Sequence, residues 1–179
     1  RIEVLRGRLL RAEAHLEADE VGQALELFQQ LEEQLTGIES SDLGPSQVRE
    51  IESLVGQSRE GVSSSRLREA TLSLEEGNRR YEDGEYVDAL ESYSRVREVL
   101  ADVSSFAIRH GLSEKRSEIN RLNQLVDTNI RRATQAPIRL EVGDAPEQPV
   151  SLPVRPRQRV QTKAPSHEGR RLRSLLQEI

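Results

Sequence analysis

Apolar residues at the start of the chain recur with the spacing of helices. Between residues 2 and 18 they follow one another every three or four positions: Ile2, Leu5, Leu9, Ala12 and Leu16. This spacing places them on one face of a helix. After a polar break at Asp19-Glu20, a second run of the same kind continues to Leu35 and stops at Gly37, a residue that readily ends helices. Two helices with so short a connection fold back on each other, so residues 2–37 predict an antiparallel hairpin.

The middle of the chain predicts helices with a weak joint between them. The loop 40–46 contains Pro45, which suits the first turn of a helix, and an apolar pattern then runs from about 46 to 61. The pattern fades at Gly61 and at Ser63-Ser64-Ser65, and it resumes from about 66 to 82. Serine lowers helix propensity without forbidding a helix. Two separate helices and one continuous helix therefore both stay open for this region.

Two further helices follow. The first is predicted from Tyr86 to Arg109 and is ended by Gly111. Ser113 can cap the second, whose apolar pattern fades before Pro137. Helices joined by such short connections pack as antiparallel neighbours. The sequence therefore predicts an all-α domain of antiparallel helical hairpins over residues 1–135.

Beyond Ala136 the chain changes character, because six of its seven prolines lie there. Proline removes a backbone donor and breaks helices, so residues 136–166 predict an extended, Pro-rich linker. Apolar residues alternate on either side of the stretch GDAPEQ, which also permits a short β-hairpin. The linker is the favoured interpretation, because an isolated two-stranded ribbon is only marginally stable.

The last residues, 167–179, predict a short amphipathic helix. Its apolar face and the basic residues beside it are Leu172, Leu175, Leu176 and Ile179 with Arg170 and Arg171. A helix this short is marginal alone in water. Its apolar face is therefore expected to dock on the acidic body of the chain, on another copy or on a partner protein.

All three tyrosines of the chain lie within thirteen residues. Small and aromatic residues around them stand at the spacing of a helical-repeat motif: Gly77, Asn78, Tyr81, Gly84, Tyr86, Ala89, Leu90, Tyr93 and Val96. Residues 70–103 thereby resemble a tetratricopeptide repeat, and residues 5–37 resemble a degenerate copy. The resemblance implies paired helices whose close crossing requires small residues. The repeat core that it implies comprises Ala12, Ala24, Phe28, Gly77, Tyr86, Ala89 and Tyr93.

The same resemblance implies which residues face a partner. In peptide-binding members of the family an asparagine directly after the repeat's glycine faces the concave groove, and Asn78 occupies that position. Tyr81 and Glu82 on the same helix, and Glu13 in the first hairpin, are the other groove candidates. Leu74 stands where a basic residue is expected, which disfavours a carboxylate clamp and favours helix-to-helix docking. The alternative interpretation of Asn78 is an ordinary surface residue.

The net charge of −5 is divided unevenly along the chain. Residues beyond Gln135 carry three more basic than acidic side chains, which leaves an acidic body with a basic tail. Basic clusters such as the one from Arg155 to Arg159 can bind nucleic acid or anionic lipid. An adaptor to one of these surfaces is therefore the alternative function. It is the weaker one, because the tail lacks the interleaved aromatic residues of a nucleic-acid site.

No catalytic or metal site is predicted. The absence of cysteine excludes thiolate ligands and nucleophiles, and the three histidines are scattered without a second ligand at helical spacing. No phosphate loop, dinucleotide glycine pattern or nucleophile elbow is present. We therefore expect a chain without enzymatic activity or cofactor. It is predicted to be a protein–protein interaction module or scaffold subunit of a larger, bacterial assembly, with proteins or copies of itself as partners.

The sequence leaves the compartment open. No run of apolar residues approaches the ~18 of a membrane-spanning helix. The chain begins at Arg1 and contains no methionine, from which we expect a processed product or a piece of a longer protein. Both the cytoplasm and the extracytoplasmic part of an anchored protein fit these observations.

Overall fold

The computed structural model describes residues 2–39, 43–142 and 147–152. Within these ranges the chain forms five α-helices and no strand, which confirms the predicted all-α fold. The helices are α1 (Ile2–Glu17), α2 (Val21–Thr36), α3 (Pro45–Glu82), α4 (Tyr86–Arg109) and α5 (Arg116–Val142), with a turn of 3-10 helix, η2 (Ser113–Lys115), before α5. The predicted docking helix of the tail lies outside the described residues, with Arg170, Arg171, Leu172, Leu175, Leu176 and Ile179.

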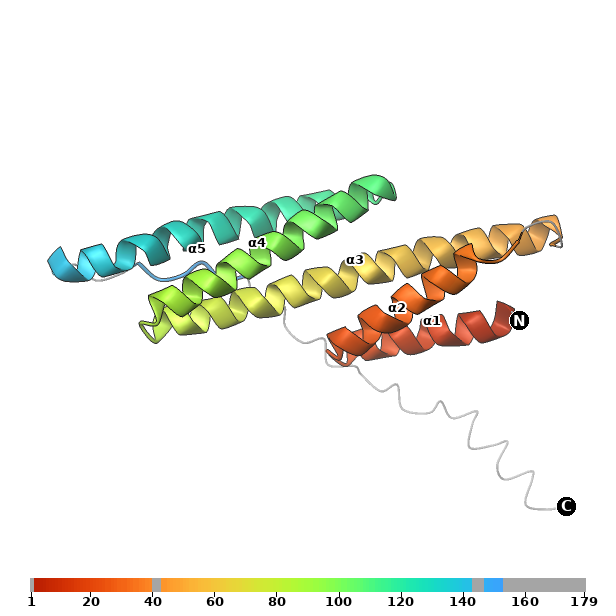
Figure 1. The fold of residues 1–179 in the computed structure, drawn as a ribbon, viewed down its shortest axis with the longest axis horizontal. Coiled ribbons are helices and arrows are strands. Elements are labelled where there is room, and N and C mark those ends of the chain that lie inside the picture. Colours follow the sequence, from red (N-terminus) through yellow and green to blue (C-terminus); the bar gives the residue numbers. More distant parts are fainter. Residues whose placement is uncertain (1, 40–42, 143–146, 153–179) are drawn as a thin grey trace, which may run out of the picture.

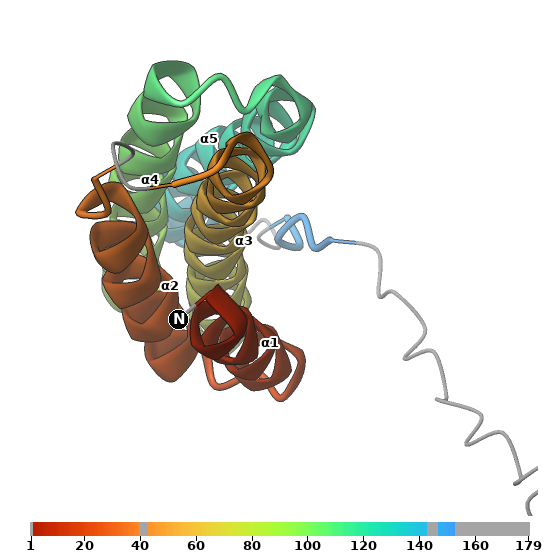
Figure 2. The same ribbon diagram turned by 90° about the vertical axis from the view of Figure 1, so that its right-hand side faces the viewer.

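Helix α3 is the spine against which the other helices pack. Successive helices run in opposite directions, and α1 and α2 cover the N-terminal half of α3 while α4 covers its C-terminal half (Figure 1). Helix α5 packs on α4 and also contacts α3. Figure 2 shows the same two groups of helices from the end of the molecule, with α1 and α2 at the bottom and α4 and α5 at the top.

Three of the helix connections are the same kind of turn. At the ends of α1, α3 and α4, one residue adopts the left-handed conformation: Asp19 (φ 62°), Gly84 (φ 81°) and Gly111 (φ 71°). In each turn the N–H of the next residue donates to a carbonyl of the last helical turn, as from Glu85 to Arg80 (2.9 Å). This Schellman arrangement satisfies the last carbonyls of the helix and reverses the chain within a few residues.

Helix α3 is continuous through the segment where the sequence left a break open. Gly61, Ser63 and Ser65 are buried. The apolar pattern fades there because the buried residues are small, while the helix itself continues. The hydroxyl of Ser58 donates to the carbonyl of Phe28 in α2 (2.7 Å), and the ring of Phe28 lies directly over Gly61. Small residues let the two helices approach closely at this crossing.

A second close crossing joins α3 to α4. A Cβ atom added to Gly77 would lie 2.6 Å from Cε1 of Tyr93, so the tyrosine ring occupies the space that the glycine leaves. Of the predicted core residues, Tyr86 is only half-buried, and its ring packs edge-on against Tyr81 with centroids 5.2 Å apart. The other predicted core residues are buried: Ala12, Ala24, Phe28, Gly77, Ala89 and Tyr93.

The apolar core consists of two clusters that share α3. The first contains residues of α1, α2 and the N-terminal half of α3. The second contains residues of the C-terminal half of α3 together with α4 and α5. Phe106 of α4 also packs against the first cluster, so α4 joins the two halves of the molecule in addition to α3.

Helix α5 ends later than the sequence predicted. Residues 136–142 were expected to belong to the linker, but the helix continues through Pro137 to Val142. Proline at this position removes the hydrogen bond to the carbonyl of Ala133. Burial of Ala133 and Ala136 in the second cluster holds the helix in place across the missing bond. The helical backbone of residues 138–142 also excludes the first strand of the alternative β-hairpin.

The glycines of α3 offer a matched test of the close crossings. Gly77→Ala is expected to destabilise the fold by about 1–3 kcal/mol, because the added methyl group collides with the buried ring of Tyr93. Gly56→Ala, in the same helix, is expected to stabilise the fold by up to about 1 kcal/mol, since Gly56 faces open space and alanine favours helices. Urea unfolding followed by circular dichroism measures both. Equal free energies of unfolding for the two variants would contradict this packing.

Candidate functional site

Residues 147–152 run back beside α5 and lie against a surface made by two helices (Figure 1). Helix α3 contributes Asn78 and Tyr81 to this surface, and α5 contributes Asn129 and Arg132; we name these four residues the α3/α5 face. Residues 147–152 form neither helix nor strand, and we name them the bound segment. The face contacts this segment mainly through the backbone atoms of the segment.

Asn129 binds both backbone groups of Val150. Its Oδ1 accepts the N–H of Val150 (2.7 Å), and its Nδ2 donates to the carbonyl of the same residue (2.9 Å). Asn129 is 0% exposed. Burying an amide without hydrogen bonds costs roughly 2–7 kcal/mol, depending on the reference state. The two bonds to Val150 therefore explain how an asparagine is tolerated on the otherwise apolar buried face of α5.

Asn78 and Tyr93 extend this pairing into a buried network. Oδ1 of Asn78 accepts hydrogen bonds from Asn129 Nδ2 (2.9 Å) and from the hydroxyl of Tyr93 (2.8 Å). The N–H of Val150 can only donate, so Asn129 turns its oxygen to Val150 and its nitrogen to Asn78. Asn78 then turns its own nitrogen to the bound segment, towards the carbonyl of Val150 (3.4 Å) and Oγ of Ser151 (3.3 Å). The backbone of the segment thus fixes the orientation of both amides.

The hydroxyl of Tyr93 stays protonated and donates a hydrogen bond in this network. Burial raises the pKa of Tyr93 well above its ordinary value, and the neighbouring Tyr81 and Glu82 raise that pKa further. The hydroxyl therefore keeps its proton throughout the neutral range of pH. Asn78 consequently receives the same hydrogen bond at every pH near neutrality.

Two further side chains of the face hold the first residues of the bound segment. The hydroxyl of Tyr81 donates to the carbonyl of Glu147 (2.6 Å). Arg132 donates to the carbonyl of Gln148 and forms an ion pair with the Glu147 carboxylate (3.1 Å). This ion pair is partly exposed, so it contributes at most about 1 kcal/mol. At the other end of the segment, Leu152 packs against the second apolar cluster.

The structure brings two of the four predicted groove residues together. Asn78 and Tyr81 both contact the bound segment. Asn78 is 6% exposed, so it is not the ordinary surface residue of the alternative interpretation. Glu82 and Glu13 are exposed, and within the described part of the chain neither makes a hydrogen bond or ion pair with the segment.

Asn129 and Arg132 were missed in the sequence. The buried positions of α5 follow one another at intervals of three and four: Ile119, Leu122, Val126, Asn129, Ala133 and Ala136. Asn129 is the polar member of this series, and a polar residue in a buried series needs a hydrogen-bond partner. The sequence alone therefore contains a signal for Asn129, namely a polar residue in a series of apolar ones. Arg132 gives no such signal, because arginine is common on exposed helix surfaces.

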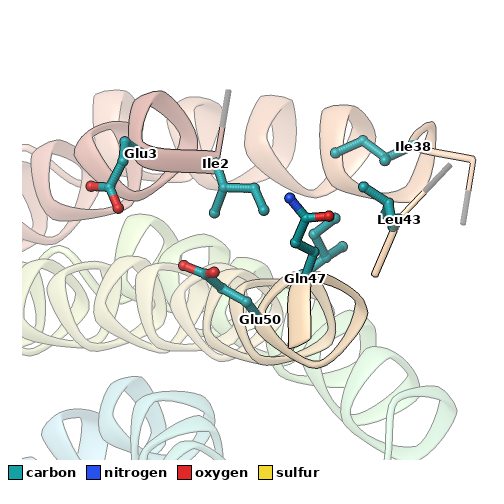
Figure 3. A pocket seen from close by; sticks show the side chains of 7 residues that line it. Ile2, Glu3, Ile38, Leu43, Gln47 and Glu50 are labelled. Carbon is teal, nitrogen blue, oxygen red and sulfur yellow. The ribbon is translucent and has the colours of Figure 1, made fainter. Parts of the chain in front are cut away.

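A pocket of about 350 Å³ lies away from the face, where the start of α1 meets the end of α2 and the start of α3 (Figure 3). Its lining combines apolar and polar side chains: Ile2, Ile38, Leu43 and Ile51 with Glu3, Gln47 and Glu50. Residues 40–42, which precede Leu43 in the chain, lie outside the described residues. We therefore assign no ligand to this pocket.

Other features give no independent pointer to a function. Among the described residues, no three metal-ligating side chains gather at one place. None of the helices in that part of the chain combines the length and the apolar character of a membrane-spanning segment. No protein-family model matches the chain, and neither does any curated protein or solved structure.

An aspartate in place of Asn129 tests the buried network. Asn129→Asp keeps the acceptor for the N–H of Val150 but removes the donor to Asn78 and to the Val150 carbonyl. We expect a loss of about 1–3 kcal/mol in the free energy of unfolding at pH 7, measured by urea unfolding. Burial raises the pKa of the new carboxyl group in the folded state, so the loss should shrink as the pH falls towards 4.

Asn120→Asp is the matched control, because Asn120 is exposed on the same helix. It should change the free energy of unfolding by less than about 0.5 kcal/mol. Similar losses for the two variants would contradict the network.

Proposed function

We propose that this chain is a non-catalytic protein–protein interaction module, a scaffold subunit of tetratricopeptide-like helical hairpins that binds a polypeptide segment on its α3/α5 face. The observation that carries the proposal is the pairing of Asn129 with both backbone groups of Val150. An asparagine side chain offers one acceptor and two donors, like the groups of the peptide backbone that it binds. It therefore recognises polypeptide through atoms that nearly every residue shares.

The other contacts of the face favour the same class of ligand. Tyr81 and Arg132 donate to two successive carbonyls of the bound segment. On each helix the two contacting residues are about one turn apart, so the face offers a row of hydrogen-bonding groups along a chain. Nucleic acids and lipid headgroups present phosphates, which are bound mainly by cations. Of the four residues of the face only Arg132 is cationic, so the face is poorly suited to phosphate.

The tetratricopeptide-like assignment is supported by a correspondence between the first hairpin and the hairpin of α3 and α4. The left-handed residues Asp19 and Gly84 stand at the same place in their turns. Ala24 and Ala89 follow them at the same distance along the chain, and both are 0% exposed. Each alanine lies where the second helix of its hairpin is buried, as small residues at a helix crossing require.

Binding of a peptide with the sequence of residues 145–154 tests the proposal. The protein is the full chain with Val150→Pro, which removes the N–H that Asn129 accepts and so weakens the hold of the face on its own segment. We expect saturable binding of the fluorescein-labelled peptide, measured by fluorescence anisotropy. A peptide with N-methylvaline at the position of Val150 should bind at least about tenfold more weakly, because it lacks the same donor.

A scrambled peptide of the same composition is the control for this experiment. Adding Asn129→Asp to the protein should weaken binding of the native peptide to a similar extent as the N-methyl group. If the native peptide binds no better than the scrambled one, the face does not bind polypeptide in trans and the proposal fails.

A further inference from the structure

The α3/α5 face already has an occupant from its own chain, and that occupant is held at the surface. Among the six described residues of the bound segment none is fully buried: Glu147, Gln148 and Ser151 are exposed, and Pro149, Val150 and Leu152 are half-buried. Apolar stabilisation scales with the area removed from water, so the segment gains little of it. Its attachment depends mainly on backbone hydrogen bonds and on the partly exposed ion pair of Glu147.

Three residues of the face, in contrast, are buried beneath the segment: Asn78, Tyr81 and Asn129. If the segment leaves, Asn129 loses the partner of its oxygen and one partner of its nitrogen, and Asn78 loses both acceptors of its nitrogen. Unpaired buried amides are unfavourable. Exchange of one polypeptide segment for another therefore costs less than leaving the face empty.

We infer that residues 147–152 are a built-in competitor, which occupies the α3/α5 face until a partner segment of the same chemistry displaces it. This inference rests on the proposed function of the face. The partner segment is a polypeptide with an acidic residue, a proline followed by a residue that keeps its backbone N–H, and a leucine two positions after that residue, as in Glu147, Pro149-Val150 and Leu152.

Each element of this pattern has a partner or a physical reason in the structure. The acidic residue pairs with Arg132 (3.1 Å), and the leucine packs against the second apolar cluster. Proline restricts the free segment to fewer conformations, so less entropy is lost when the segment binds. The residue after the proline supplies the N–H and carbonyl that Asn129 binds, so it must be a residue other than proline.

The competitor lowers the apparent affinity of the face for a partner segment. Four residues, 143–146, connect the end of α5 to the bound segment. A link this short gives an effective concentration on the order of millimolar. The apparent affinity of a free partner equals its intrinsic affinity multiplied by the fraction of molecules in which the face is free. A partner must therefore either make additional contacts or be held nearby in an assembly.

The test compares four full-length chains, the unmodified one and three variants, in their binding of the peptide of residues 145–154. Val150→Pro should bind the peptide at least about tenfold more tightly than the unmodified chain, because its own segment competes less. Gln148→Ala is the matched control within the segment. Because Gln148 is exposed and Arg132 binds its backbone carbonyl, which the substitution keeps, this variant should bind like the unmodified chain. Leu152→Ser, which removes the apolar contact instead of the hydrogen bond, should also bind more tightly.

In the unmodified chain, displacement of residues 147–152 can be detected by amide hydrogen exchange. The amide proton of Val150 should exchange slowly with solvent in the free protein, since it donates to the buried Asn129. Saturation with unlabelled peptide should bring this proton to the exchange rate of an unstructured chain, as followed by nuclear magnetic resonance.

The possible outcomes distinguish the competitor from the proposed function of the face. Tight binding by Val150→Pro and Leu152→Ser with weak binding by the other two chains supports the competitor. Equally tight binding by all four chains overturns the competitor and leaves the proposed function standing. Absence of binding by Val150→Pro and Leu152→Ser, with unchanged helical circular dichroism, overturns both.

Discussion

The ring of Tyr93 on Gly77 is the contact on which both the packing and the candidate site depend. Because Gly77 has no side chain, α4 approaches α3 closely enough for the ring to fill the space above it. The hydroxyl at the end of the ring then reaches Oδ1 of Asn78, the next residue of α3 (2.8 Å). A larger residue at position 77 would separate the helices and move this hydroxyl away. The same helix crossing therefore determines both the packing of the core and the position of the polar network.

The buried network connects the packing of three helices to the contact with residues 147–152. Asn78 comes from α3, Tyr93 from α4 and Asn129 from α5, and none of them can be satisfied by its own helix alone. The groups left over point at the backbone of Val150. Since leaving a buried amide without hydrogen bonds is unfavourable, the stability of this half of the molecule and the occupancy of its face are linked. Residues 147–152 meet this need within the chain itself.

The sequence predicts the helices well, because their apolar spacing is local information. It does not predict that α3 is continuous at Gly61, because the small residue there is explained by the ring of Phe28, which packs over it from another helix. The sequence also does not predict that α5 continues past Pro137. Burial of neighbouring residues against other helices outweighs the one hydrogen bond that the proline removes, and this burial is not visible in the local sequence. Asn78 was found through the repeat resemblance. Its pairing with Asn129 was not, because the approach of α5 to α3 is decided by the topology.

The side-chain amide of Asn129 reports most directly on whether the face binds polypeptide backbone. Nuclear magnetic resonance of the full-length chain should show its two Nδ2 protons resolved, protected from exchange with solvent, and close in space to Asn78 and to the bound segment. With Val150→Pro the protection should fall, and addition of the peptide of residues 145–154 should restore it. Rapid exchange of these protons in the unmodified chain, with no cross-peaks to the segment, would contradict the account.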